Sequence, residues 1–172
     1  FAAGSGITPI LSIAATTLEE QPESKFTLVY GNRRMSSVMF NEALQDLKDR
    51  YAGRFTMIHI LSRQAQEVDL LQGRIDAEKV QALIDTLLPA KSMDEVFICG
   101  PEAMIDATAA ALVAAGVPES RVYSERFATS PAQAAKVQAD SDAADAKIAA
   151  AKDKMMTVVL DGKEYEIPVS SD

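Results

Sequence analysis

The sequence has no tryptophan, a single cysteine and fewer basic than acidic residues, and each shortage excludes a class of protein. Cys99 alone cannot form a disulfide within the chain or build a cysteine-ligated cluster, and we expect no metal site. The 17 Lys and Arg against 25 Asp and Glu give a net charge of −8, which argues against nucleic-acid binding because neutralising phosphates needs a basic face. No apolar run is long enough to cross a bilayer and no signal peptide is visible, so we expect no membrane association and a cytoplasmic protein.

Short apolar runs alternate along the chain with segments whose apolar residues recur at helical spacing. The apolar runs span residues 26–30, 55–61, 95–99 and 121–127. The helical segments span residues 8–18, 37–51, 77–88 and 101–115. Strands that alternate with helices indicate βαβ units, because parallel neighbours need a crossover between them. The sequence therefore predicts an α/β fold with a doubly wound parallel sheet, whose ligand crevice lies at the carboxyl ends of the strands.

Composition divides the chain into three parts. Residues 1–127 carry the alternating pattern, whereas residues 128–155 are rich in Ala, Asp and Lys and are interpreted as a linker. Residues 156–172 contain two strand-like runs joined by Asp161-Gly162, a pair that favours a two-residue turn. Because an isolated hairpin is marginally stable in water, we interpret these last residues as the opening of a further domain.

The chain opens on Phe1-Ala2-Ala3, directly before a glycine-containing turn. A central strand is normally longer, so we expect the first strand to be mostly missing and the chain to be a piece of a longer protein. We also expect such a fragment to be unstable by itself unless another segment fills that position in the sheet.

The turn itself reads Gly4-Ser5-Gly6-Ile7-Thr8-Pro9 and leads into a helical segment. Its glycines permit close approach of the backbone, and Pro9 suits the first turn of a helix. A strand that ends in such a turn presents backbone N–H groups and the positive end of a helix dipole to an anion. The turn is not a P-loop, because no Lys-Ser/Thr pair follows the glycines, and an ordinary strand–helix turn remains the alternative.

Arginines follow the next two predicted strands. Arg33 comes after Tyr30-Gly31-Asn32, Ser62-Arg63 closes the following strand, and Arg74 lies a short loop later. At this position an acidic residue would accept from a ribose 2′-OH, whereas arginines favour a 2′-phosphate. The pattern therefore favours NADPH, with NADH as the alternative coenzyme.

Cys99-Gly100-Pro101 ends the fourth run, where Gly100 permits a sharp exit and Pro101 starts the next helix. This arrangement brings the Cys99 thiol to the crevice, although a buried cysteine that acts as a small apolar residue is the alternative. No histidine adjoins it, and His59 lies within an apolar run, where we expect it to pack in the core. A Cys–His hydrolase is therefore a poor interpretation.

Together these residues resemble the nucleotide-binding domain of the ferredoxin–NADP reductase superfamily over residues 1–127. The resemblance rests on five motifs in the family's order: Gly4–Pro9, Tyr30-Gly31-Asn32-Arg33, Ser62-Arg63, Cys99-Gly100-Pro101 and Glu125-Arg126-Phe127. More narrowly, the opening run, the Cys99 strand end and the trailing hairpin resemble the reductase components of phenylacetyl-CoA epoxidases, which are ring-epoxidising monooxygenases. In that group an FAD domain comes first, the nucleotide domain second and a [2Fe–2S] domain last, after a linker.

The resemblance implies a role for each motif. The residues expected to cradle the pyrophosphate and the nicotinamide side are Gly4, Ser5, Gly6, Thr8 and Pro9. Those expected to bind the 2′-phosphate are Arg33, Ser62, Arg63 and Arg74. Those expected around the nicotinamide are Cys99, Gly100 and Pro101, with Glu125 and Phe127 lining the contact between nicotinamide and flavin. Cys99 would place the nicotinamide C4 against the flavin N5 by position and not as a nucleophile.

The implied activity is electron transfer from NADPH through FAD and a [2Fe–2S] cluster to the oxygenase component of a multicomponent monooxygenase. The flavin domain, and the rest of the iron–sulfur domain that residues 156–172 begin, would lie outside this chain, so we expect the chain alone to be inactive. A non-catalytic nucleotide-binding or interaction module is one alternative. A ferredoxin reductase or a flavohaemoprotein-type reductase with another acceptor is the other.

Overall fold

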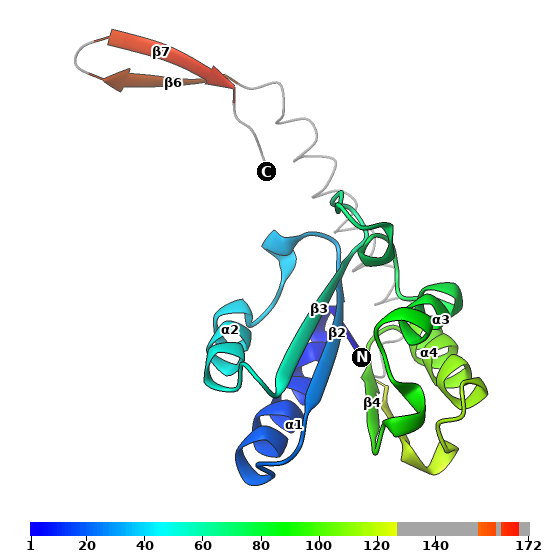
Figure 1. Ribbon diagram of the computed structural model, residues 1–172. Helices are drawn as coiled ribbons and strands as arrows, with labels where there is room; N and C mark the ends of the chain where they lie inside the picture. The colour runs from blue at the N-terminus through cyan, green and yellow to red at the C-terminus, as the bar shows by residue number, and fades with distance from the viewer. Residues whose placement is uncertain (127–154, 161–162, 169–172) are drawn as a thin grey trace. The chain divides into compact units, whose positions relative to one another are not determined.

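The computed structural model describes residues 1–126, 155–160 and 163–168 (Figure 1). The chain divides into two compact units, Phe1–Phe127 and Ala128–Asp172.

A five-stranded parallel sheet forms the centre of the first unit. Its strands are β1 (Ala2–Ala3), β2 (Phe26–Asn32), β3 (Phe55–Leu61), β4 (Val96–Cys99) and β5 (Val122–Glu125). They lie in the order β3-β2-β1-β4-β5, and every neighbouring pair is parallel. Since the chain runs outward from β1 in one direction and then outward from β4 in the other, the predicted doubly wound sheet is confirmed.

Four helices connect the strands. They are α1 (Ile7–Glu20), α2 (Asn41–Arg50), α3 (Ala77–Thr86) and α4 (Glu102–Ala114). Five 3-10 turns also occur in this unit: η1 (Gly4–Gly6), η2 (Met35–Ser37), η3 (Asp69–Leu71), η4 (Ala90–Ser92) and η5 (Glu119–Arg121). The second helix begins later than the predicted residue 37, because η2 comes first and Phe40, the residue before α2, takes a left-handed φ of 57°.

The sheet separates two apolar cores, because successive side chains of a strand point to opposite faces. On one face α1 and α2 pack over Leu28, Tyr30 and Cys99, and on the other α3 and α4 pack over Val29 and Ile98 (Figure 1). This arrangement explains why the predicted strands carry continuous apolar runs: both of their faces are covered.

The short strand β1 lies in the middle of the sheet. Ala2 pairs with Tyr30 of β2 on one side and with Cys99 of β4 on the other. Cys99 N–H also donates to the Phe1 carbonyl at 3.0 Å. The turn that follows β1 therefore emerges between the ends of β2 and β4.

The second unit contains an antiparallel pair, β6 (Met155–Leu160) and β7 (Lys163–Pro168), in which Leu160 pairs with Lys163. Asp161-Gly162 and the predicted linker 128–155, apart from Met155, lie outside the described residues. The linker and the further domain stay predictions. Among the described helices, none combines the length and the apolar character that a membrane crossing needs.

Candidate functional site

The turn after β1 and the end of β4 touch through their backbones. A Cβ atom placed on Gly6 would lie 2.2 Å from the Cys99 carbonyl oxygen and 2.9 Å from the Gly100 nitrogen. Only glycine allows this approach, since real Cβ atoms do not come that close to a backbone oxygen. The contact lies between β1 and β4, whose connections leave in opposite directions, and doubly wound sheets bind their ligands at this point.

The turn leaves its first N–H groups without side-chain caps. Gly4, Ser5 and Gly6 form η1, which runs directly into α1, and neither η1 nor α1 has a side-chain cap. Thr8 and Pro9 lie in the first turn of α1, where the Thr8 hydroxyl donates to the Ser5 carbonyl at 3.0 Å. The first N–H groups of a helix have no partner within it, so this end can hold an anion.

A buried tyrosine holds the turn from below. The Tyr30 hydroxyl donates to the Gly4 carbonyl at 3.0 Å, and Gly4 has a left-handed φ of +53°. Burial raises the pKa of this hydroxyl above its ordinary value.

The arginines after β2 and β3 lie on adjacent segments. Ser62 N–H donates to the Asn32 carbonyl at 3.0 Å and Arg63 N–H to the Arg33 carbonyl at 2.9 Å, so the pairing of the two strands continues past their ends. Both arginines are half-buried. The sequence placed Arg33, Ser62 and Arg63 at one edge of the sheet, and the structure brings them together there.

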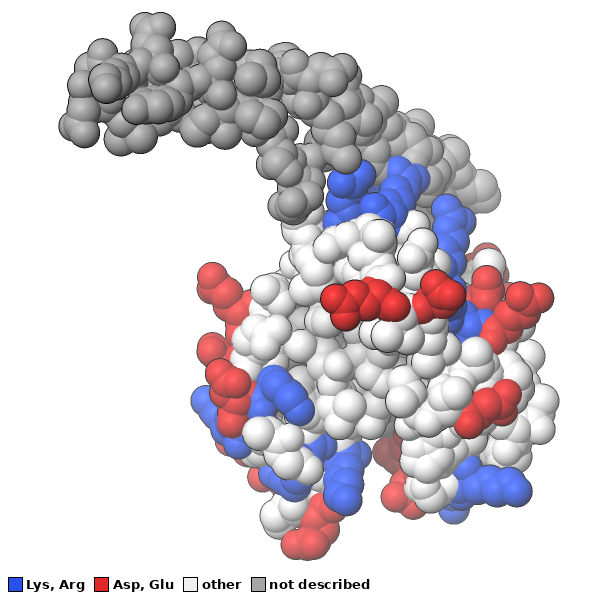
Figure 2. All heavy atoms as spheres, turned by 45° about the horizontal axis from the view of Figure 1, so that its top comes forward, with Lys and Arg blue, Asp and Glu red and all other residues white. Residues whose placement is uncertain are grey.

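Arg74 reaches the same edge from the loop beyond β3. Gly73 N–H donates to the Leu61 carbonyl at 2.9 Å, so the loop runs beside the end of β3. Arg74 also lines a hollow shared with Asp76, Glu78 and Lys79. Figure 2, turned so that the carboxyl ends of the strands come forward, shows basic side chains gathered at the upper edge of this unit.

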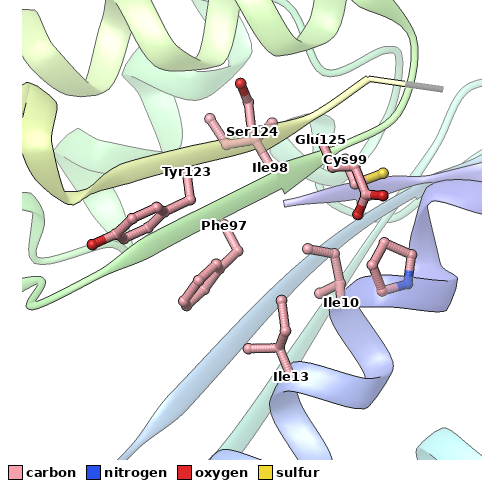
Figure 3. A pocket seen from close by; sticks show the side chains of 9 residues that line it. Ile10, Ile13, Phe97, Ile98, Cys99, Tyr123, Ser124 and Glu125 are labelled. Atoms are coloured by element: carbon pink, nitrogen blue, oxygen red, sulfur yellow. The ribbon is translucent and has the colours of Figure 1, made fainter. Parts of the chain in front are cut away.

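A hollow of about 170 Å³ lies between the start of α1 and the ends of β4 and β5. It is lined by Pro9, Ile10, Ile13, Phe97, Ile98, Cys99, Tyr123, Ser124 and Glu125. Figure 3 shows Ile10 and Ile13 pointing from α1 toward the strands, and Cys99 and Glu125 lying together at the strand ends. Three of the predicted site residues, Pro9, Cys99 and Glu125, therefore share one mostly apolar hollow.

Cys99 is buried and also lines this hollow, so both interpretations of its position apply. Burial, and then the Glu125 carboxylate, raise the pKa of the Cys99 thiol. The sulfur is therefore a neutral thiol at pH 7 and a poor nucleophile. His59 is half-buried in β3, with β2 and β1 between it and β4, so the residues form no Cys–His pair. Burial lowers the pKa of His59.

Gly100 and Pro101 connect β4 to α4 in close contact with β1. A Cβ on Gly100 would lie 2.7 Å from the Met104 methyl group and 3.2 Å from the Ala3 Cβ, and Pro101 precedes the first residue of α4. Arg126, after β5, forms ion pairs with Glu102 at 3.1 Å and with Asp106 at 2.6 Å. These pairs attach the end of β5 to α4. Phe127 lies outside the described residues.

The sequence did not indicate the apolar wall of the hollow or the hydroxyl beneath the turn. Tyr123 lines the hollow because β5 pairs with β4, and Ile13 lines it from α1, and no local pattern states either placement. The sequence offered one sign that the Tyr30 hydroxyl makes a hydrogen bond. Tyr30 lies among apolar strand residues, and a buried hydroxyl needs a partner. Arg121, at the end of η5, donates to the Met93 carbonyl at 3.3 Å.

The family described as the oxidoreductase NAD-binding domain matches residues 1–110 of this chain. The chain belongs to that family. It is 45% identical to a component of the 1,2-phenylacetyl-CoA epoxidase of Escherichia coli (strain K12), covering 99% of this chain and 46% of that protein. It is 36% identical to the ferredoxin reductase component of a 3-ketosteroid-9-alpha-monooxygenase from Rhodococcus rhodochrous, covering 97% of this chain and 44% of that protein. The chain thus spans less than half the length of these two relatives.

Solved structures share the fold of the first unit. The cytochrome P450 reductase GcoB of Amycolatopsis matches with a TM-score of 0.61 at 22% identity, over 73% of this chain and 36% of that chain. The CS-b5R domains of human Ncb5or, in their NAD+ form, match with a TM-score of 0.60 at 25% identity, over 72% of this chain and 34% of that chain. The predicted membership of the ferredoxin reductase group is confirmed.

Proposed function

We propose that this chain is the NADPH-binding part of a reductase that supplies electrons to an oxygenase. The observation that carries the proposal is the contact of Gly6 with the Cys99 carbonyl. It joins an uncapped helix start to the hollow that Cys99 and Glu125 line, so one extended ligand can reach both. The membership of an NAD-binding oxidoreductase family supports this assignment.

The pyrophosphate would lie on the turn. Ser5 and Gly6 offer backbone N–H groups, and the dipole of α1, a helix of 14 residues, adds positive potential at the same place. The exposed Thr8 side chain is engaged by the Ser5 carbonyl and stiffens the turn.

The adenosine end would lie over β2 and β3. Arg33 and Arg63 are adjacent there and Ser62 lies beside them, which supports binding of a 2′-phosphate by charged donors. Arg74 would join them from the loop beyond β3, where it lines a hollow with Asp76, Glu78 and Lys79.

The nicotinamide would enter the hollow between α1 and β4. When bound, NADPH supplies a hydride from its C4 atom to the flavin of the reductase. The neutral Cys99 thiol and the aliphatic side chains of α1 would give the nicotinamide ring an apolar surface to pack against. Glu125 supplies a carboxylate beside that surface. Cys99 thus acts by contact and position.

The iron–sulfur cluster does not fit this chain, because a [2Fe–2S] cluster takes four protein ligands and the sequence has one cysteine. FAD and any cluster would be held by other parts of the protein, and we derive no step through them.

We further propose that the electron acceptor is the oxygenase component of a phenylacetyl-CoA epoxidase. The support is the 45% identity to a component of such an epoxidase over 99% of this chain. A steroid monooxygenase is the second acceptor class to test, because its reductase component is 36% identical.

The test is reduction of ferricyanide by the full-length, flavin-loaded protein with NADPH as donor. We expect turnover with NADPH and slower turnover with NADH. Addition of an epoxidase oxygenase component should then give coupled NADPH oxidation, measured at 340 nm. Absence of NADPH-dependent reduction in a yellow, folded preparation would refute the proposal, and turnover without coupling would refute the acceptor alone.

A further inference from the structure

We infer that Tyr30 is a positioning residue that fixes the orientation of the Gly4–Ser5 peptide for the pyrophosphate. The inference rests on the proposed function, because it concerns the turn that we assign to NADPH. Tyr30 belongs to the motif Tyr30-Gly31-Asn32-Arg33, but the sequence analysis gave its side chain no role.

The geometry of a trans peptide supplies the first step. The Tyr30 hydroxyl, whose residue is 0% exposed, donates to the Gly4 carbonyl at 3.0 Å, so this oxygen points into the protein. The carbonyl and the N–H of a trans peptide point in opposite directions, and no peptide bond of the described residues is cis. The Ser5 N–H therefore points outward, and Ser5 is exposed.

The backbone of Gly4 supplies the second step. Its φ of +53° is a conformation that other L residues adopt with strain. Two donors hold the Gly4 carbonyl: the Ile7 N–H within the 3-10 turn, and the Tyr30 hydroxyl from the sheet below. If the peptide turned over, a carbonyl oxygen would face the phosphates in place of an N–H group, and like charges would repel.

The register of the sheet places Tyr30 where its hydroxyl can donate to the Gly4 carbonyl. Tyr30 pairs with Ala2, and Cys99 pairs with Ala2 from the other side, so all three lie in one row beneath the start of α1. The ring is locked by packing and the hydroxyl is therefore fixed in place.

The experiment compares Tyr30→Phe with Tyr51→Phe in the full-length, flavin-loaded protein. Tyr51, at the end of α2, stacks beside Arg54 away from the turn and serves as the matched control. Isothermal titration calorimetry with NADP+ should give a Kd raised about threefold to tenfold in Y30F, the loss expected for one neutral hydrogen bond, and an unchanged Kd in Y51F.

A donor without phosphates separates positioning from general damage. With 1-benzyl-1,4-dihydronicotinamide, Y30F should keep the wild-type kcat/KM, whereas with NADPH its KM should rise and its kcat stay the same. A Kd for NADP+ within twofold of wild type, or an equal loss with both donors, would overturn the inference. Failure of the wild-type protein to bind NADP+ would instead overturn the proposed function.

If Y30F is not recovered folded, Gly4 itself provides the test, because nothing lies within 4 Å of a Cβ placed there. Asn tolerates a left-handed φ better than Ala. We expect Gly4→Ala to weaken NADP+ binding more than Gly4→Asn does. The reverse order, in which the larger side chain is the worse one, would contradict the inference.

Discussion

Cys99 and Glu125 are register partners at the ends of β4 and β5, and both line the hollow beside the first turn of α1. Their proximity has an electrostatic consequence, because a carboxylate next to a thiol disfavours the thiolate. The hollow therefore combines one negative charge with one sulfur that stays neutral.

Replacement of Glu125 by Gln should lower the pKa of the Cys99 thiol, since it removes one of the two causes that raise it. The measurement is the pH dependence of iodoacetamide alkylation of the Cys99 peptide, followed by mass spectrometry. The midpoint should shift to lower pH in E125Q. Glu119→Gln, an exposed change in η5, should leave it in place. An identical midpoint in E125Q would show that the carboxylate does not act on the thiol.

The free energy of unfolding should fall as the pH drops below about 6.5, the ordinary pKa of histidine. Burial lowers the pKa of His59, so the unfolded chain takes up a proton at a pH where the folded chain does not. His59→Phe should flatten this part of the profile, measured by urea denaturation between pH 7.5 and 5.5. If the free energy of unfolding of the variant still falls over this pH range, the pH dependence comes from groups other than His59.

Replacement of Gly6 by Ala should destabilise the fold by about 3 kcal/mol, because the new methyl group meets the Cys99 carbonyl and one backbone must move. Gly53→Ala is the matched control, since nothing lies within 4 Å of a Cβ there and its change should stay within about 1 kcal/mol. Urea denaturation checks both values. Equal stability of the two variants would place the turn farther from β4 than we describe.

Replacement of Arg63 by Ala should raise the KM for NADPH about fivefold to 150-fold, the loss of a charged hydrogen bond worth about 1–3 kcal/mol. The KM for NADH should change little, because NADH lacks the 2′-phosphate. Arg50→Ala removes the same charge from the exposed end of α2 and should alter neither constant. Steady-state kinetics with both coenzymes gives the answer, and an equal loss for NADH would refute the role assigned to Arg63.

The fold could be predicted from the sequence because its signals are local. Apolar runs such as residues 55–61 and helical spacing such as that of residues 77–88 depend on neighbours within one element, and the structure shows β3 and α3 there. The parallel order followed from the need for crossovers. The details of the turn did not follow, since the approach of Gly6 to Cys99 joins residues far apart in the sequence.

The same limit applies to the site. The sequence placed Arg74 among the phosphate ligands, and this assignment stays a prediction. The conformation of its loop, which no periodicity determines, sets Asp76, Glu78 and Lys79 around the same hollow. Tyr30 opened one of the five motifs, but no role of its hydroxyl followed from the sequence, because the register of β1 and β2 is what sets this hydroxyl under Gly4.

The strand order β3-β2-β1-β4-β5 also places two functions on opposite sides of β1. The arginines that would distinguish one coenzyme from another follow β2 and β3, while Cys99 and Glu125 end β4 and β5. Substitutions at the ends of β2 and β3 could therefore change the coenzyme preference between NADPH and NADH. The ends of β4 and β5 would stay as they are, so the geometry of hydride transfer would be kept.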